Sequence, residues 1–211
     1  MTEGTVTEPV YFDLIIHDLH LPTVRIKVQP GDASDPRRVI RTAERESKEQ
    51  VRKAKKGVLG INEPARFDHV WAVMDTDVAV RNNIWNDVKQ LAAARKVRLA
   101  HSTPCFEFWL LLHITGFTTR ADLVDGNAAK AAVKVALGRD YSTNQETAKQ
   151  AIARFFSKWP EAVGHAENVR RHHEGAQTPN PANPSAEVDL LARALNDSAP
   201  EHLRRLRPPN P

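Results

Sequence analysis

The chain has 211 residues but only one cysteine, Cys105, and it has no long apolar run. A single cysteine cannot form an internal disulfide, which suits a reducing compartment. The longest apolar stretch, 106–114, is interrupted by Glu107 and His113 and is far too short to span a bilayer. The chain opens with MTEGTVTEP, without a basic patch and an apolar block, so no secretory signal is visible. These absences predict a cytoplasmic protein that does not enter a membrane.

The composition is that of an ordinary globular protein. Hydrophobic residues make up 41% of the chain and charged residues 27%. The 30 basic residues exceed the 26 acidic ones, which gives a net charge of +4. This balance permits a polyanionic partner without requiring one. The length fits one domain with elaborations, or two small domains.

Hydrophobic periodicity predicts two kinds of segment in the first half of the chain. Helices are expected at 9–19, 35–56 and 84–96, and strands at 23–28, 70–74 and 97–101. Strands that alternate with helices are typical of a parallel sheet covered by helices.

Helical patterns dominate the second half of the chain. They cover 106–113, 128–137, 147–159 and 186–195, and the proline-rich stretch GAQTPNPANPS between the last two is expected to be a loop. We therefore predict an α/β core at 1–114, a helical extension at 115–200 and a flexible basic tail at 201–211.

The most informative stretch is FDHVWAVMDTDVAV, at 67–80, in which a buried strand ends on Asp75 and Asp77. If the strand continues, both side chains point to the same face. Two neighbouring carboxylates repel each other and lose solvation, and a divalent cation such as Mg²⁺ would offset that cost. Ligands of open parallel sheets lie beyond the carboxyl ends of the strands. The simpler alternative is a pair of solvated acids where a strand meets a loop.

Two further acids stand in distinctive surroundings. Glu3 precedes Gly4 and a helix start, and Glu107 follows Pro104 among aromatic and aliphatic residues. The segments EGTVTEPVYF at 3–12 and PCFEFWLLLH at 104–113 flank the aspartate pair, and NPS follows at 183–185. With these motifs in this order, the chain resembles the RloB-like family, whose core looks like a Toprim domain.

The resemblance implies a Toprim-like parallel sheet flanked by helices and a metal site at its edge. Glu3, Asp75 and Asp77 would hold Mg²⁺ or Mn²⁺, with Glu3 also a candidate general acid or base. Glu107 would have a supporting catalytic role nearby. The metal would polarise a phosphodiester and stabilise the charge developing on it. With only Tyr11 and Tyr141 as tyrosines, a topoisomerase is the less favoured Toprim activity.

The implied function is a nuclease effector of anti-phage defence that acts by abortive infection. Its target would be DNA or RNA, tRNA included, and an ABC- or AAA-type ATPase would be its partner. Homo-oligomers are compatible with this interpretation. Val6 stands where the family usually has lysine, and Met1–Thr2 is too short for an apolar first strand, so either the gene starts further upstream or the sheet lacks this strand. These departures favour the alternative, a non-catalytic Toprim-like subunit that binds an ATPase partner.

Other chemically suggestive residues have simpler explanations. Basic side chains at 38–55 recur at helical spacing, and a solvated face is favoured over a track for phosphates. Cys105 is expected to be a buried small side chain rather than a nucleophile, and His113 to pack at a helix end. A zinc site at His165, His172 and His173 is disfavoured because no cysteine supports it.

Overall fold

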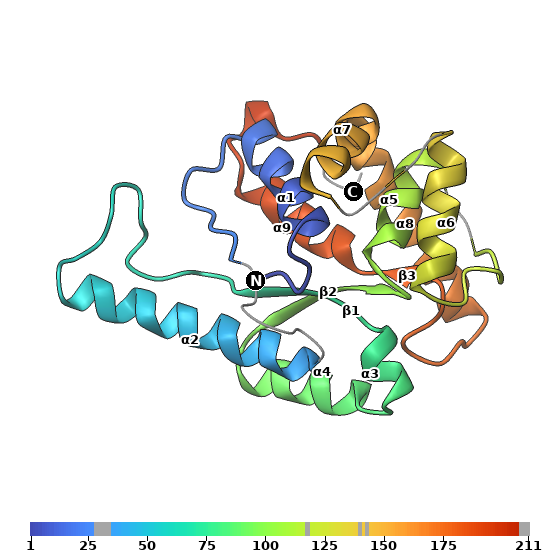
Figure 1. Ribbon diagram of the computed structural model, residues 1–211. Coiled ribbons are helices and arrows are strands. Elements are labelled where there is room, and N and C mark those ends of the chain that lie inside the picture. The colour runs from blue at the N-terminus through green and yellow to red at the C-terminus, as the bar shows by residue number, and fades with distance from the viewer. Residues whose placement is uncertain (28–34, 117–118, 139–140, 142–143, 207–211) are drawn as a thin grey trace.

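Helices surround a small sheet in the computed structural model, which describes residues 1–27, 35–116, 119–138, 141 and 144–206 (Figure 1). The elements are α1 (Thr7–Asp18), α2 (Pro36–Lys55), β1 (Trp71–Asp75), α3 (Asp77–Arg81), α4 (Trp85–Ala94), β2 (Arg98–Thr103), α5 (Phe106–Ile114), α6 (Gly126–Leu137), α7 (Gln145–Phe155), α8 (Trp159–Gly175), β3 (Ser185–Ala186) and α9 (Val188–Ser198). Short 3₁₀ turns lie at Phe156–Lys158 and Glu201–Leu203. The predicted α/β class is confirmed.

The sheet is mixed, with strand order β1-β2-β3. The predicted parallel pairing holds for β1 and β2, in which Asp75 lies opposite Ser102. β3 runs antiparallel to β2, with Ser185 opposite Thr103, so the prediction of a wholly parallel sheet is wrong. β3 was not predicted because two residues at the end of a proline-rich connector are too few to show a periodic pattern.

The predicted strand at 23–28 is absent over residues 23–27, and residue 28 lies outside the described part of the chain. Val24 and Ile26 are half-buried against the core, which explains the alternating pattern in the sequence. The backbone carbonyl of Lys27 accepts a hydrogen bond from the amide of Thr2, at 2.9 Å. The alternation of apolar and polar residues at 23–27 therefore reflects burial of one side of the segment, not pairing with a neighbouring strand.

The N-terminal residues pair with the edge of β1. Val73 donates its amide to the carbonyl of Met1 at 2.8 Å, and Glu3 donates to the carbonyl of Val73 at 3.0 Å. Thr2 and Val73 form a parallel bridge. The segment is too short for a regular strand, as predicted, but this pairing carries Glu3 to the carboxyl end of β1.

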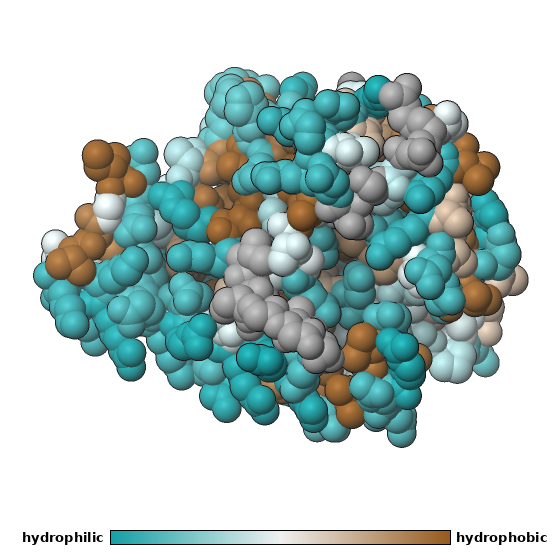
Figure 2. Space-filling model, viewed as in Figure 1, coloured by the Kyte–Doolittle hydropathy of each residue, from teal (hydrophilic) through white to brown (hydrophobic). Residues whose placement is uncertain are grey.

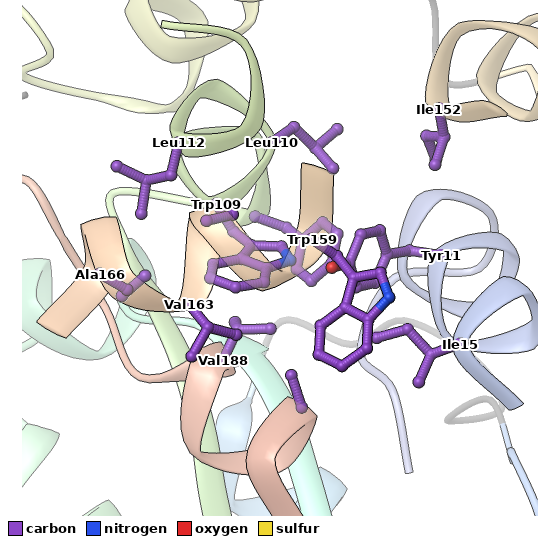
Figure 3. Close-up of a cluster of buried hydrophobic side chains, with 14 of the residues drawn as sticks. Tyr11, Ile15, Trp109, Leu110, Leu112, Ile152, Trp159, Val163, Ala166 and Val188 are labelled. Carbon is purple, nitrogen blue, oxygen red and sulfur yellow. The ribbon is translucent and has the colours of Figure 1, made fainter. Parts of the chain in front are cut away.

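Helices cover both faces of the sheet, as predicted (Figure 1). Alternate residues of β1 face opposite ways: Ala72 and Met74 pack with α2 and α4, and Val73 packs on the other face. The core on that other face is the larger one, and Figure 3 shows Trp109 and Trp159 at its centre. It draws residues from both the predicted core and the predicted extension, so 1–114 and 115–200 share one hydrophobic core.

The helix α5 lies inside this larger core. Residues 106–113 are all buried, because α5 contacts β2, α6 and α8 on different sides. A helix that is apolar all round is expected in such a place.

The apolar helix α5 is too short to span a membrane, because its nine residues extend only about 14 Å. Within the described residues, no helix has both the length and the apolar character needed to cross a membrane.

Candidate functional site

Acidic side chains gather at the carboxyl end of β1. Asp75 is the last residue of this strand and faces the same way as Val73, toward the larger core. Its Oδ1 accepts the amide hydrogen of Phe106 at 2.9 Å, at the start of α5. The amide of Asp75 donates to Oε2 of Glu3 at 3.3 Å. Three segments far apart in the sequence therefore meet here.

Two more glutamates come from the first turns of α5 and α1. Glu107 is 4% exposed, and its Oε1 accepts a hydrogen bond from the hydroxyl of Tyr141 at 3.4 Å. Glu8 is 6% exposed, and its Oε1 accepts the amide hydrogen of Gly4 at 3.1 Å. Glu8 was not among the predicted site residues, although it belongs to the segment EGTVTEPVYF.

Burial and mutual repulsion disfavour the charged forms of Glu3, Glu8 and Asp75. Burial raises the pKa of Glu3 to about 7, helped by Glu8 and Asp77 and opposed by the bond from the amide of Asp75. Burial, with the charge of Glu107, also raises the pKa of Glu8 to about 7. The pKa of Asp75 lies well above its usual range because of burial and then of Glu8, Glu3 and Glu107. With all of these acids ionised, the cluster would hold more negative charge than its surroundings compensate.

Asp77 lies in a different position from the one its spacing predicts. β1 ends at Asp75 and the chain turns into α3 at Asp77, so the expectation that the strand continues and presents both acids on one face is wrong. Oδ1 of Asp77 accepts the amide hydrogen of Val78 at 2.7 Å, and Oδ2 lies 3.5 Å from the guanidinium of Arg81. Its side chain is 40% exposed. Asp77 thus lies at the rim of the cluster.

Ser102 lies beside Asp75 and was not predicted as a site residue. The two residues are register partners in parallel strands, so their side chains share a face. Ser102 is 1% exposed, and its hydroxyl has no hydrogen-bond partner within the described structure. A buried polar atom without a partner calls for an explanation such as a bound ion or water.

The donor set suits a hard divalent cation in its chemistry. Mg²⁺ and Mn²⁺ prefer carboxylate, hydroxyl and water oxygens, which this cluster offers. Over the described ranges, however, no three or more histidine, cysteine, aspartate or glutamate side chains are arranged to hold a metal ion. The carboxylates of Glu3, Glu8 and Asp75 are instead turned toward backbone amides. A cation bound here would require some of these side chains to rotate.

Cys105 and His113 are both buried, and their side chains contact neighbouring protein groups. The thiol of Cys105 is 3.9 Å from the carbonyl of Gly126, and burial raises its pKa well above the usual range. It is therefore a protonated thiol, in line with its expected place as a buried side chain. His113 bonds the hydroxyl of Tyr11 at 3.0 Å and the carbonyl of Trp109 at 2.9 Å. Burial lowers the pKa of His113 to about 3, so the ring is neutral.

His165, His173 and part of the basic face of α2 also have local partners. His165 bonds the carbonyl of Leu112 at 2.8 Å, and His173 bonds that of Pro184 at 2.8 Å, so both rings are directed at backbone. On α2, Lys48 pairs with Glu44 at 2.6 Å, and further ion pairs join Arg52 to Glu49 and Arg95 to Glu44. Part of the basic face is thus neutralised.

The chain matches the model of the family described as RloB-like protein over residues 1–195. Since the match covers most of the chain, including every acid of the cluster, the protein belongs to the RloB-like family. Comparison with curated proteins and with solved structures gave no significant match.

The raised pKa values predict that stability falls as pH rises. The carboxyls of Glu3 and Glu8 have a pKa of about 4.5 in the unfolded chain and about 7 in the fold. Between these values the folded state binds more protons, so the free energy of unfolding decreases with increasing pH. In EDTA, we expect a higher melting temperature at pH 5.5 than at pH 8. The variant Glu3→Gln with Glu8→Gln should show a smaller difference, and an equal difference would contradict this assignment.

Proposed function

We propose that the chain is a metal-dependent nucleic-acid phosphodiesterase with a Toprim-type core. One observation carries this proposal: buried and half-buried acids from four segments converge where β1 ends and α5 begins, next to an unpartnered hydroxyl. When these acids are ionised, their repulsion and lost solvation disfavour folding, and a bound divalent cation would offset that cost. Strand ends of this kind are also where open α/β sheets bind their ligands.

We assign roles to the residues of the cluster according to their position. Asp75, Glu8 and Glu107 would hold Mg²⁺ or Mn²⁺, with Asp77 contributing from the rim. The cation, when bound, would polarise a phosphodiester and stabilise the charge that develops on it. Glu3, whose pKa is about 7, can give and take a proton near neutral pH and is the candidate general acid or base.

Lys130 on α6 is the candidate cation for the substrate phosphate, in place of the lysine that Val6 replaces. The positive charge of Lys130 acts on Glu8 and partly opposes the rise in the pKa of Glu8 that burial causes. Gly126, one turn earlier on α6, lies next to Cys105, so this face of α6 is at the site. We expect Lys130→Ala to slow cleavage roughly 10- to 100-fold, with the metal-induced rise in melting temperature unchanged. Lys134→Ala, one turn further along α6, is the matched control and should cleave at the wild-type rate.

The defence role rests on membership of the RloB-like family together with the resemblance described above. On that basis we propose that the nuclease acts on phage or host nucleic acid and that an ATPase partner restrains it. The target, whether DNA, RNA or tRNA, follows from the cleavage assay.

The direct test is cleavage of single- and double-stranded DNA, RNA and tRNA with Mg²⁺, Mn²⁺ or EDTA. We expect one class of substrate to be cut by the wild type with a divalent cation and by neither Asp75→Asn nor the wild type in EDTA. Asp87→Asn, which changes an exposed acid in the first turn of α4, should cleave normally. Cleavage that persists in Asp75→Asn would show that the activity lies elsewhere or belongs to a contaminant.

One observation favours the alternative of a non-catalytic subunit. The carboxylates at this edge already accept hydrogen bonds from backbone amides or from Tyr141, so the cluster can persist as a structural element. A protein of this kind would bind an ATPase partner yet show neither cleavage nor a metal-induced change in melting temperature. The same assays therefore separate the two functions.

A further inference from the structure

A cleft of about 560 Å³ lies at the edge of β1, and none of the acids of the cluster lines it. Its apolar lining comes from β1, α1 and α9, where Trp71, Ile16 and Leu195 contribute. The segments 1–2, 21–27 and 63–70, together with α2, form the rest of the lining. Figure 2 shows brown, apolar side chains in the hollow on this side of the molecule. The cleft has the size of a ligand pocket, although nothing in the proposed reaction requires it.

Residues 57–66, here named the arm, project from the body beyond the end of α2 (Figure 1). Ile61 is 92% exposed and Val58 is 60% exposed. Neighbouring exposed residues of this kind are a stronger signal of a contact surface than a single one.

The arm is held in place rather than loosely attached. Arg25 donates to the carbonyl of Asn62 at 2.9 Å, and Gln50 donates to the carbonyl of Pro64 at 2.7 Å. Within the arm, the amide of Glu63 donates to the carbonyl of Gly60 at 3.1 Å. The apolar side chains are therefore presented in a fixed position, which lowers the entropic cost of docking them.

The rim of the cleft carries charges of both signs. Its lining includes the basic residues Arg25, Lys27, Lys53 and Arg66 and the acidic residues Glu46, Glu49, Glu63 and Asp68. Lys27 and Glu46 form an ion pair at 3.5 Å. A rim of mixed sign does not attract a polyanion such as nucleic acid, but it can complement a second surface with the same mixture.

We propose that a second copy of this chain occupies the cleft, with the apolar tip of each arm docked into the cleft of its partner. Glu63 and Pro64 belong to the arm and also line the cleft, so the two surfaces are neighbours on one side of the molecule. One two-fold axis can therefore form both contacts at once and close the assembly as a dimer. The interface buries Val58 and Ile61, which the monomer leaves in water.

Sedimentation velocity over a range of concentrations tests the proposal. We expect the wild type to be a dimer, and Val58→Asp with Ile61→Asp to raise the dissociation constant by about tenfold or more. Val135→Asp changes an 81% exposed side chain on α6 and should leave the dimer intact. A wild type that stays monomeric at the highest soluble concentration, or an arm variant that dimerises normally, would overturn the proposal.

A mixing experiment identifies the two surfaces as partners. Ala194→Trp should block the cleft, because Ala194 lines it from α9. The arm variant and the cleft variant should each be monomeric alone. Mixed together, they should form a weaker heterodimer, since one intact arm then meets one intact cleft. If labelled copies of the two variants fail to associate, or if the cleft variant alone dimerises normally, the arm does not dock in this cleft.

Discussion

Asp75→Asn is expected to abolish the rise in melting temperature that Mg²⁺ or Mn²⁺ produces in the wild-type protein. A cation bound only to the folded state at a hundred times its dissociation constant stabilises by about 2.7 kcal/mol. For a chain of this length that corresponds to roughly 5–10 °C. Asparagine keeps the oxygen that accepts the amide hydrogen of Phe106 and removes only the charge. The variant should therefore remain folded in EDTA, and it should be slightly more stable than wild type because the repulsion within the cluster decreases.

Two further variants separate the inner acids from the rim. Glu8→Gln should also lose the metal-induced rise, because Glu8 is buried beside Glu107. Asp77→Asn should keep most of the rise, since Asp77 is partly exposed and already pairs with Val78 and Arg81. Differential scanning fluorimetry with EDTA, Mg²⁺ and Mn²⁺ measures all three variants. An undiminished rise in Asp75→Asn would place the cation elsewhere.

Arg170→Ala is expected to reduce the free energy of unfolding by about 3–5 kcal/mol. The guanidinium of Arg170 donates to both carboxylate oxygens of Asp189 and to the carbonyl of Ala186 at 3.2 Å. Asp189 is fully buried at the start of α9. Removing the arginine would leave a buried carboxylate without its main partner, and it would also disconnect α8 from the strand–helix junction at β3 and α9.

Urea denaturation measures this loss, and two variants control it. Arg171→Ala changes the neighbouring exposed arginine, which lies 3.8 Å from Glu167, and should cost less than about 1 kcal/mol. Arg170→Met with Asp189→Leu removes both charges, so it should recover much of the stability lost in the single variant. Equal losses for Arg170→Ala and Arg171→Ala would mean that the buried pair does not stabilise this junction.

Much of the secondary structure could be predicted from the sequence, since helices and strands leave a local periodic signal. The helix α1, the parallel strands β1 and β2 and the buried helix α5 were all predicted within a few residues of their bounds. The motifs around Glu3, Asp75 and Glu107 likewise indicated the RloB-like family, to which the match over residues 1–195 assigns the chain. Local order along the chain is sufficient for both kinds of inference.

The tertiary structure alone decided how these segments meet. Glu8 faces Glu107 and Ser102 lies beside Asp75 because of helix packing and strand register, which depend on residues far apart in the sequence. The segment 1–3 pairs with β1 through backbone atoms, which have no sequence signature. Asp77 leaves the strand direction because the chain turns into α3, and β3 is defined only by its partner β2. The sequence by itself indicated many of the helices and the two parallel strands, whereas long-range pairing determined which acids share one site.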